Sequence, residues 1–278
     1  MRLALTGASG YVGGTLLQAL RQEGHATLAW SRRECPAPWN PYELKSDPPA
    51  LPWAGCDALI HAAHDFTARD FPQHQSRNIR PSLALLDSAR NAGLRHLIFI
   101  SSFSCFEGTR SAYGRAKLAI EQEWLAGGGT VIRPGLVWGD QPGGVMGALE
   151  RIVTRLPVVP CLTGPHGLPQ YLVHEHDLCA AVLDLLQATP CAGGRLIEAA
   201  HPDPLPLREI LTLIARRQHL RRVFLPCPWQ LAMAALKTAE ALRINPSFRS
   251  DSLTGLVHSV PALQTDPALL RQRFRAFV

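Results

Sequence analysis

Residues 2–14 read RLALTGASGYVGG, a short apolar run followed by glycines at positions 7, 10 and 13. Where a strand turns into a helix, the first glycine permits the tight bend and the second lets the backbone approach a pyrophosphate. The third lets the helix pack closely on the strand, so that phosphates meet the positive N-terminus of the helix. The spacing therefore predicts a dinucleotide-binding turn, whose contacts we assign to Gly7, Ser9, Gly10, Tyr11, Val12 and Gly13.

The first half of the chain alternates short apolar runs with helical patterns. Strands are expected at residues 2–6, 25–30, 57–62, 97–101 and 130–133, and helices after the glycine turn and at residues 78–92 and 112–126. This alternation is typical of βαβ units and predicts an α/β fold with a doubly wound parallel sheet of the Rossmann type. Residues 34–56 contain six prolines, so no regular crossover helix is expected there.

The pattern changes beyond Pro134, where loops rich in glycine and proline separate helical segments. These segments are expected near residues 145–155, 176–187, 207–218 and 228–243. We therefore predict two parts: residues 1–160 form the dinucleotide-binding domain and carry the catalytic residues. Residues 161–278 form a smaller, mainly helical substrate-side lobe whose strands could return to the main sheet.

The end of the second strand bears on which dinucleotide binds. An NAD site places a carboxylate there for the ribose hydroxyls, whereas a 2′-phosphate is held by arginine. This chain has Ser31, Arg32 and Arg33 at that point, with no acid before Glu34. Because guanidinium groups match phosphate in charge and geometry, NADP(H) is preferred over NAD(H).

Tyr113 and Lys117 stand four residues apart in an expected helix, on one face of it. A nearby ammonium lowers the pKa of a tyrosine, which would let Tyr113 exchange a proton with a carbonyl oxygen. The preceding strand ends at Ser101 and Ser102. Ligand sites lie at such strand ends in parallel sheets, so we expect Ser101 to contact the cofactor and a hydroxyl from this pair to orient the reacting oxygen.

Six segments together resemble the extended short-chain dehydrogenases/reductases, the group also known as the NAD-dependent epimerase/dehydratase family. They are TGASGYVGG at the start, LIHAA at 59–63, ISS at 100–102, YGRAK at 113–117, IRPGLVWG at 132–139 and LVHEHDL at 172–178. The likeness covers residues 1–185 and is weak beyond them. These motifs identify the superfamily and leave the substrate open.

The resemblance implies a catalytic Ser102–Tyr113–Lys117 triad, in which Lys117 also holds the nicotinamide ribose. It implies that Asn78 supports a water molecule that relays protons to the lysine. It further implies cofactor contacts at Ala62, Ala63, Pro134 and Leu136. Two departures matter: Phe106-Glu107-Gly108 replaces the usual Tyr-Gly, which keeps Ser104 as an alternative to Ser102. The family's adenine-contacting aspartate has only Asp47 as a candidate.

The composition and the spacing of charged and metal-binding residues argue against several kinds of ligand and partner. The chain has 28 basic and 22 acidic residues, and its arginines are scattered rather than gathered in a run, so nucleic-acid binding is not expected. Its seven cysteines and its histidines lack metal-ligand spacing, which predicts no metal site and no disulfide framework. Without a signal-peptide pattern or a long apolar segment, we expect a cytoplasmic location and no membrane span.

Arg133 is interpreted as solvated rather than as a ligand for an anionic substrate.

These observations favour an NADP(H)-dependent carbonyl reductase or alcohol dehydrogenase acting on a small or medium-sized organic molecule. The first alternative is a nucleotide-sugar epimerase or dehydratase that oxidises and re-reduces its cofactor within one turnover. The second is a non-catalytic dinucleotide sensor, which the Tyr–Lys pair argues against. The family resemblance also implies a homodimer through the helices at 78–92 and 110–126.

Overall fold

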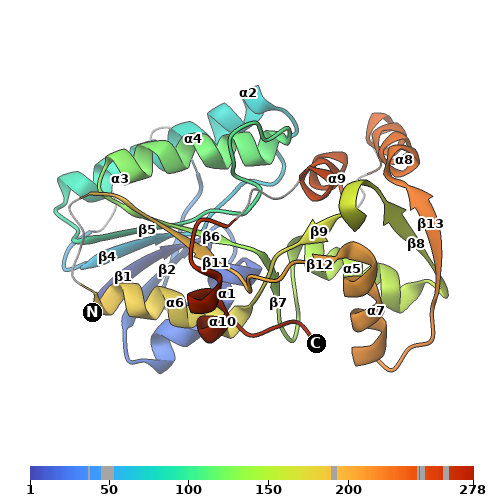
Figure 1. Cartoon of the computed structure of the whole chain (residues 1–278). Helices are drawn as coiled ribbons and strands as arrows, with labels where there is room; N and C mark the ends of the chain where they lie inside the picture. The colour runs from blue at the N-terminus through green and yellow to red at the C-terminus, as the bar shows by residue number, and fades with distance from the viewer. Residues whose placement is uncertain (37, 45–52, 189–192, 243, 245–247, 259–262) are drawn as a thin grey trace.

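The computed structural model describes residues 1–36, 38–44, 53–188, 193–242, 244, 248–258 and 263–278. A seven-stranded sheet forms one half of the molecule and a smaller lobe the other (Figure 1). The candidate adenine ligand Asp47 lies outside the described residues.

The sheet is parallel throughout, which confirms the predicted Rossmann-type α/β fold. Its strands, in spatial order, are β3 (Trp39–Pro41), β2 (Ala26–Ser31), β1 (Arg2–Thr6), β4 (Ala58–His61), β5 (His96–Ile100), β6 (Thr130–Pro134) and β11 (Arg195–Ala199). The order reverses between β1 and β4, and such a switch point is where doubly wound sheets bind ligands. The central strands are buried on both faces because helices cover each side.

Two sets of helices make those layers (Figure 1). On one face α1 (Tyr11–Gln22), α6 (Glu175–Gln187) and α10 (Pro267–Arg273) pack leucines onto the sheet. On the other, α3 (Arg80–Asn91) and α4 (Ala112–Ala126) pack Leu85, Ile120 and Trp124 against it. The chain enters α3 through α2 (Phe71–His74) and the π-helical turn η1 (Gln75–Ile79).

The proline-rich region forms the edge strand β3 in place of a crossover helix. Among residues 32–36, 38–44 and 53–57 no helix occurs, as the prolines predict. The indole of Trp39 donates a hydrogen bond to the Ser31 hydroxyl at 3.0 Å, which ties β3 to the end of β2. Strand β3 itself was not predicted, because its three residues contain no alternating pattern.

The smaller lobe has its own apolar core. It contains α5 (Gly144–Arg155), α7 (Leu207–Arg217), α8 (Trp229–Ala241) and α9 (Ser250–Val257), with β8 (Val158–Thr163) parallel to β13 (Val223–Pro228). Short strand pairs connect it to the sheet: β7 (Leu136–Trp138) with β10 (Leu172–His174), and β9 (Pro169–Gln170) with β12 (Leu205–Pro206), beside the short helix η2 (Pro165–Gly167). The segment beyond residue 161 also supplies β11, α6 and α10 to the main sheet.

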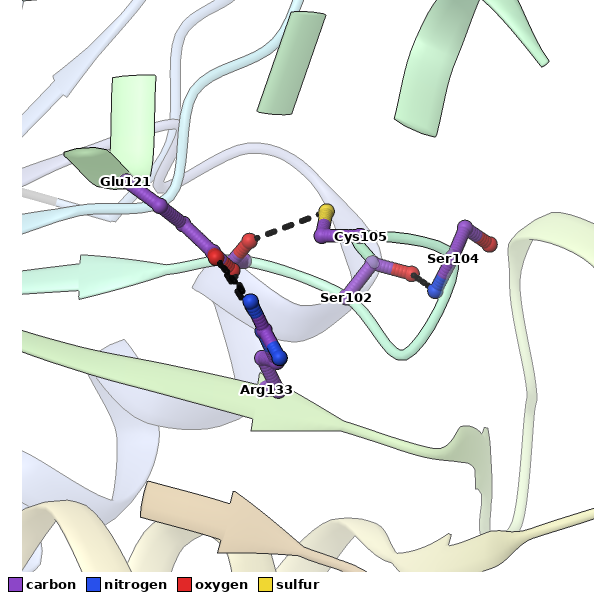
Figure 2. Close-up of polar contacts among 6 residues, drawn as sticks. Ser102, Ser104, Cys105, Glu121 and Arg133 are labelled. Atoms are coloured by element: carbon purple, nitrogen blue, oxygen red, sulfur yellow. Dashed lines mark hydrogen bonds and ion pairs between the residues drawn. The ribbon is translucent and has the colours of Figure 1, made fainter. Parts of the chain in front are cut away.

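A buried ion pair joins α4 to β6, where the sequence suggested a solvated arginine. Arg133 donates from Nε and Nη2 to both carboxylate oxygens of Glu121, at 2.6 to 3.0 Å (Figure 2). The side chain of Glu121 is 1% exposed and that of Arg133 is 13% exposed. Arg133 is therefore a structural partner of Glu121, and the earlier interpretation is wrong.

Removing one member of this pair leaves a buried charge without a partner. We expect Arg133→Met to lower the free energy of unfolding by about 3–5 kcal/mol, measured by urea denaturation at neutral pH. The double variant Arg133→Met/Glu121→Gln carries no such charge and should regain most of that loss. An Arg133→Met protein as stable as the parent would show that the pair contributes nothing.

Candidate active site at the carboxyl edge of the sheet

The glycine turn between β1 and α1 has the shape that a pyrophosphate requires. Gly7 has a φ of +74°. A Cβ on Gly13 would lie 2.1 Å from the carbonyl oxygen of Gly7, so helix and strand approach too closely for any side chain. Helix α1 starts at Tyr11 after Gly10 without a side-chain cap. Its first amides therefore remain available to an anion at the positive end of the helix.

The ends of β1 and β4 meet at this turn. A Cβ on Gly7 would lie 2.7 Å from the amide nitrogen of Ala63 and 2.8 Å from the carbonyl carbon of Ala62. The Ala63 amide donates to Thr6 Oγ1 at 3.3 Å. Ala62 and Ala63 thus border the glycine turn, where the family resemblance implies cofactor contacts.

Tyr11 has a side chain that serves packing. Its ring lies against Gly143, where a Cβ would approach to 2.6 Å. Burial, together with the nearby Glu175 carboxylate, raises the pKa of the Tyr11 phenol well above its ordinary value. Only the main chain of Tyr11 is therefore positioned for a phosphate.

At the end of β2, Ser31 is buried whereas Arg32 and Arg33 are exposed. The Ser31 hydroxyl donates to the carbonyl of Arg33, so it shapes the turn. The pKa of Asp65 is lowered: burial opposes the shift, but hydrogen bonds from Thr67 and the charges of Arg32 and Arg77 outweigh it. Arg32 therefore acts electrostatically on the loop after β4.

Lys117 lies fully inside the protein beneath the end of β5. Its Nζ donates to the carbonyl oxygen of Ile100 at 2.7 Å and sits 4.5 Å from the centre of the Phe99 ring. Burial lowers the pKa of Lys117 to about 8, although Cys105 and Glu121 oppose the shift. The ammonium therefore persists at neutral pH, but less firmly than on the surface.

Tyr113, one turn earlier on α4, is protonated at neutral pH. Burial raises the pKa of its phenol, Cys105 adds to the shift and a hydrogen bond with Ser102 opposes it. The expectation that the neighbouring lysine lowers the pKa of Tyr113 is therefore wrong for this structure, because burial dominates the shift. A neutral phenol is a proton donor, the form that reduction of a carbonyl requires.

The serines after β5 point in different directions (Figure 2). Ser102 interacts with Tyr113 and also accepts a hydrogen bond from the Ser104 amide at 3.1 Å. Ser101 pairs with Cys105, whose Sγ lies 3.3 Å from its hydroxyl oxygen. Ser104 instead lies beside α9, with its Oγ 3.6 Å from where a Cβ on Gly255 would be. This geometry favours Ser102 over Ser104 as the partner of Tyr113.

The remaining predicted residues lie along the same edge. Asn78, buried in η1, accepts from the Asp65 amide at 2.7 Å and donates to the Asp65 carbonyl at 3.1 Å. Its amide nitrogen also lies 3.1 Å from Nδ1 of His74, so its side chain holds the loop after β4. Pro134 ends β6 and its carbonyl accepts from the Phe103 amide at 3.1 Å, whereas Leu136 begins β7.

Two aromatic side chains of the loop after β4 contact Tyr113. His64 meets Tyr113 edge to face with ring centres 4.9 Å apart, and Phe66 stacks at 5.9 Å. The Nε2 atom of His64 is buried and has no hydrogen-bond partner within the described chain. Burial lowers the pKa of His64, so a neutral imidazole faces the reaction site. No motif in the sequence marks His64 or Phe66 as a neighbour of Tyr113.

A segment far along the chain fixes both elements of the site. Asp251 accepts hydrogen bonds from the amides of Ala112 at 2.7 Å and Tyr113 at 3.1 Å, which caps α4. Arg249 donates to the carbonyls of Phe66 at 2.8 Å and Ala68 at 3.3 Å. No motif marks these two residues, and the contacts span at least 138 positions.

No group of metal-ligating side chains occurs among the residues that the structure describes. His61, for example, is bonded to Thr6 at 2.7 Å and Ser82 at 2.8 Å, and burial lowers its pKa to about 3. Within the same residues, no helix has the length and apolar character needed to cross a bilayer.

The phosphate turn, the Tyr–Lys pair and the serines at one sheet edge define a dinucleotide-dependent enzyme. A model of the NAD dependent epimerase/dehydratase family matches residues 3–190, more than half of the chain. The chain belongs to this family, as the sequence motifs predicted.

Known relatives include both reductases and sugar-modifying enzymes. A ceramide reductase of Caulobacter vibrioides is 28% identical over 277 residues, covering 95% of this chain and 84% of the relative. A 4-hydroxy-2-methyl-3-oxo-4-farnesyl-3,4-dihydroquinoline-1-oxide ketoreductase of Stigmatella aurantiaca is 27% identical over 290 residues, covering 91% and 84%. A solved UDP-N-acetylglucosamine 4-epimerase from Bacillus cereus has a TM-score of 0.70 at 14% identity, covering 93% and 95% of the two chains. MoeE5 in complex with UDP-glucose and NAD has a TM-score of 0.70 at 20% identity, covering 82% and 85%.

These relatives agree with an NAD(P)-dependent oxidoreductase or epimerase/dehydratase. The identities to the solved structures are low enough that they establish the fold alone.

The buried ammonium makes a testable difference to stability. Because the pKa of Lys117 falls from 10.5 in the unfolded chain to about 8 in the fold, the unfolded state binds more protons between these values. The ammonium therefore destabilises the fold by roughly 3 kcal/mol below pH 8, and this penalty disappears as the pH rises toward 10.5. Replacing Lys117 also removes its hydrogen bond to the Ile100 carbonyl. This loss costs about 1 kcal/mol and offsets part of the stability gained by removing the buried charge.

We expect Lys117→Met to be about 1–3 kcal/mol more stable than the parent at pH 7, with a smaller margin at pH 10, by urea denaturation. The exposed Lys237 provides the control, and Lys237→Met should change stability by less than about 0.5 kcal/mol at both pH values. A Lys117→Met protein less stable than the parent at pH 7 would contradict the assigned cost of burial.

Proposed function

We propose that this enzyme is an NADP(H)-dependent ketone reductase that uses Ser102, Tyr113 and Lys117. The observation that carries the proposal is the placement of Tyr113 beside Ser102 and one helical turn before the buried Lys117, whose Nζ donates to the Ile100 carbonyl. Both curated relatives are named as reductases. Because their names describe molecules with long apolar chains, we extend the proposal to a ketone on a substrate with a large apolar part.

The chain's own residues divide the work of reduction. The cofactor, bound at the glycine turn, supplies the hydride that reaches the carbonyl carbon. Tyr113 donates its phenolic proton to the carbonyl oxygen, while Ser102 hydrogen-bonds that oxygen and orients it. The Lys117 ammonium stabilises the negative charge that Tyr113 acquires on losing its proton. His64 and Phe66 pack on the tyrosine ring and shield it from water.

The proposed preference for NADP(H) rests on the end of β2. The exposed guanidinium groups of Arg32 and Arg33 lie there, and no carboxylate occurs between the end of β2 and Glu34. The charge of Arg32 also contributes to the lowered pKa of Asp65, which lies on the loop after β4.

The two alternatives have weaker support. Nucleotide-sugar epimerization rests on the solved neighbours, one of which contains UDP-glucose and NAD, and it predicts a tightly held cofactor. A non-catalytic sensor would have no need of the Tyr113–Ser102 contact. Pairing of two chains through α3 and α4 is retained as a prediction from the family resemblance.

Cofactor selectivity tests the proposal first. Calorimetry on the parent should give NADPH at least tenfold tighter binding than NADH, which corresponds to about 1.4 kcal/mol. Arg32→Ala/Arg33→Ala should remove this margin because it removes the phosphate ligands. The control Arg216→Ala/Arg221→Ala loses the same charge from exposed sites in the smaller lobe and should keep the margin. Equal NADH and NADPH affinity in the parent would favour the epimerase alternative.

Catalysis tests the assigned proton donor. With a series of methyl ketones of increasing alkyl length and NADPH, Tyr113→Phe should lower kcat by about 100- to 10,000-fold while the Kd for NADPH stays within about twofold. Ser102→Ala should also reduce kcat strongly, and the matched Ser104→Ala should not. If Ser104→Ala is the damaging variant, the assignment of Ser102 is wrong. If no ketone turns over while the cofactor binds, the sensor alternative gains.

A further inference from the structure

The smaller lobe exposes an unusual amount of apolar surface. Eleven large hydrophobic side chains are exposed among the described residues, and seven of them lie on or beside β8, β13 and α8. These are Leu156, Val158, Val223, Leu225, Leu231, Leu242 and Ile244, which we call the lobe-tip surface. Figure 1 shows β8, β13 and α8 at the end of the molecule away from the seven-stranded sheet.

Helix α8 is apolar on both its faces. Its inner positions Trp229, Ala232, Met233 and Leu236 pack on the core of the lobe. On its outer side, Leu231 is 64% exposed, and Leu242, directly after the last helical turn, is 68% exposed. No residue of α8 is fully buried. A helix with an apolar stripe on each side is normally covered on each side, so the outer stripe of α8 lacks its cover.

The β8–β13 pair repeats this arrangement. Val159 and Cys161 face the core, whereas the alternate positions face outward. Val158 is paired with Val223, and Pro160 with Leu225, and all four are exposed. On the opposite, core-facing side of the same strand pair, an apolar pocket of about 330 Å³ is lined by Cys161, Phe224 and Pro226 among others.

The segment that contains β13 and α8 is strongly basic, which favours an anionic partner for the lobe-tip surface. Residues 205–244 contain seven basic and two acidic side chains, a net charge of +5, while the rest of the chain sums to +1. Arg216, Arg221 and Lys237 are exposed and form no ion pair within the described part of the chain. Lys237 lies on α8 and Arg221 two residues before β13, so unpaired cations share these elements with exposed leucines and valines, which matches an interface that is both apolar and anionic.

We infer that the lobe-tip surface docks the enzyme onto an anionic phospholipid bilayer. The leucine and valine side chains enter the boundary between headgroups and acyl chains, and the basic side chains face the phosphates. A second copy of this chain fits less well, because a two-fold contact would bring two segments of charge +5 together. The inference concerns a surface remote from the reacting atoms and does not depend on the proposed reaction.

The lobe-tip surface is tied to the catalytic helix through α9. Glu240 on α8 accepts hydrogen bonds from the Ser250 amide at 2.9 Å and from its hydroxyl at 2.7 Å. The residues on either side of Ser250 are Arg249, which holds the Phe66 loop, and Asp251, which caps α4 at Tyr113. A bilayer bound at α8 would therefore be connected to Tyr113 through two sets of hydrogen bonds, from Glu240 to Ser250 and from Asp251 to the Tyr113 amide.

Flotation with lipid vesicles tests the inference without cofactor or substrate. The full chain should float with vesicles of phosphatidylcholine and phosphatidylglycerol in equal parts, and about tenfold less with phosphatidylcholine alone, since each basic residue near the surface contributes about 1 kcal/mol. Raising the salt concentration should weaken the binding. Leu231→Asp/Leu242→Asp should reduce it at least tenfold, as should Lys237→Glu/Arg221→Glu.

The control is Leu269→Asp, since Leu269 is 59% exposed on α10, outside this surface. It should float like the parent, and all variants should keep the parent's melting temperature within a few degrees because the altered side chains are exposed. The inference is wrong if the parent does not float with the anionic vesicles, or if Leu269→Asp loses binding equally. It is also wrong if Leu231→Asp/Leu242→Asp only dissociates a dimer, which would assign the surface to a second copy.

Discussion

The contact between the Lys117 ammonium and the Ile100 carbonyl determines the geometry of the site. This 2.7 Å hydrogen bond joins the middle of α4 to the last residue of β5. Because Tyr113 lies one helical turn before the lysine and the serines directly follow Ile100, the same bond sets the distance between Tyr113 and Ser102. The bond keeps a charged group in an apolar interior, and the lowered pKa of about 8 for Lys117 reflects the free-energy cost of burying that charge. The geometry of the site therefore depends on the Lys117 ammonium, although burying this charge is itself unfavourable.

Features encoded by neighbouring residues could be predicted from the sequence. The glycine turn, the Tyr113–Lys117 spacing and the main strands depend on residues within a few positions of one another. The parallel sheet follows from their alternation, and the structure confirms it. Features that depend on distant pairing could not be predicted in this way. The β8–β13 pair joins segments about 65 positions apart, and Asp251 reaches α4 across 138 positions.

Burial explains the two chemical predictions that failed. Arg133 ends a short predicted strand, and no spacing in the sequence pairs it with Glu121, so solvation was the simpler expectation. In the fold it covers Glu121, a carboxylate that is 1% exposed and needs a cation. Tyr113 was expected to have a lowered pKa because a lysine follows it, but the spacing says nothing about solvent. His64 and Phe66 contact the ring of Tyr113, and burial of the phenol, together with the charge of Cys105, raises its pKa.

Helix α9 gives the two halves of the molecule a shared role. Its first turn holds the N-terminus of α4 through Asp251, and the preceding Arg249 holds the loop that carries Phe66. The same turn is held in place by Glu240 from α8. Neither half can therefore shift without moving a group that contacts Tyr113. Although the sheet and α4 together carry the glycine turn and the proposed Ser102–Tyr113–Lys117 set, the N-terminus of α4 is held by a carboxylate from the smaller lobe.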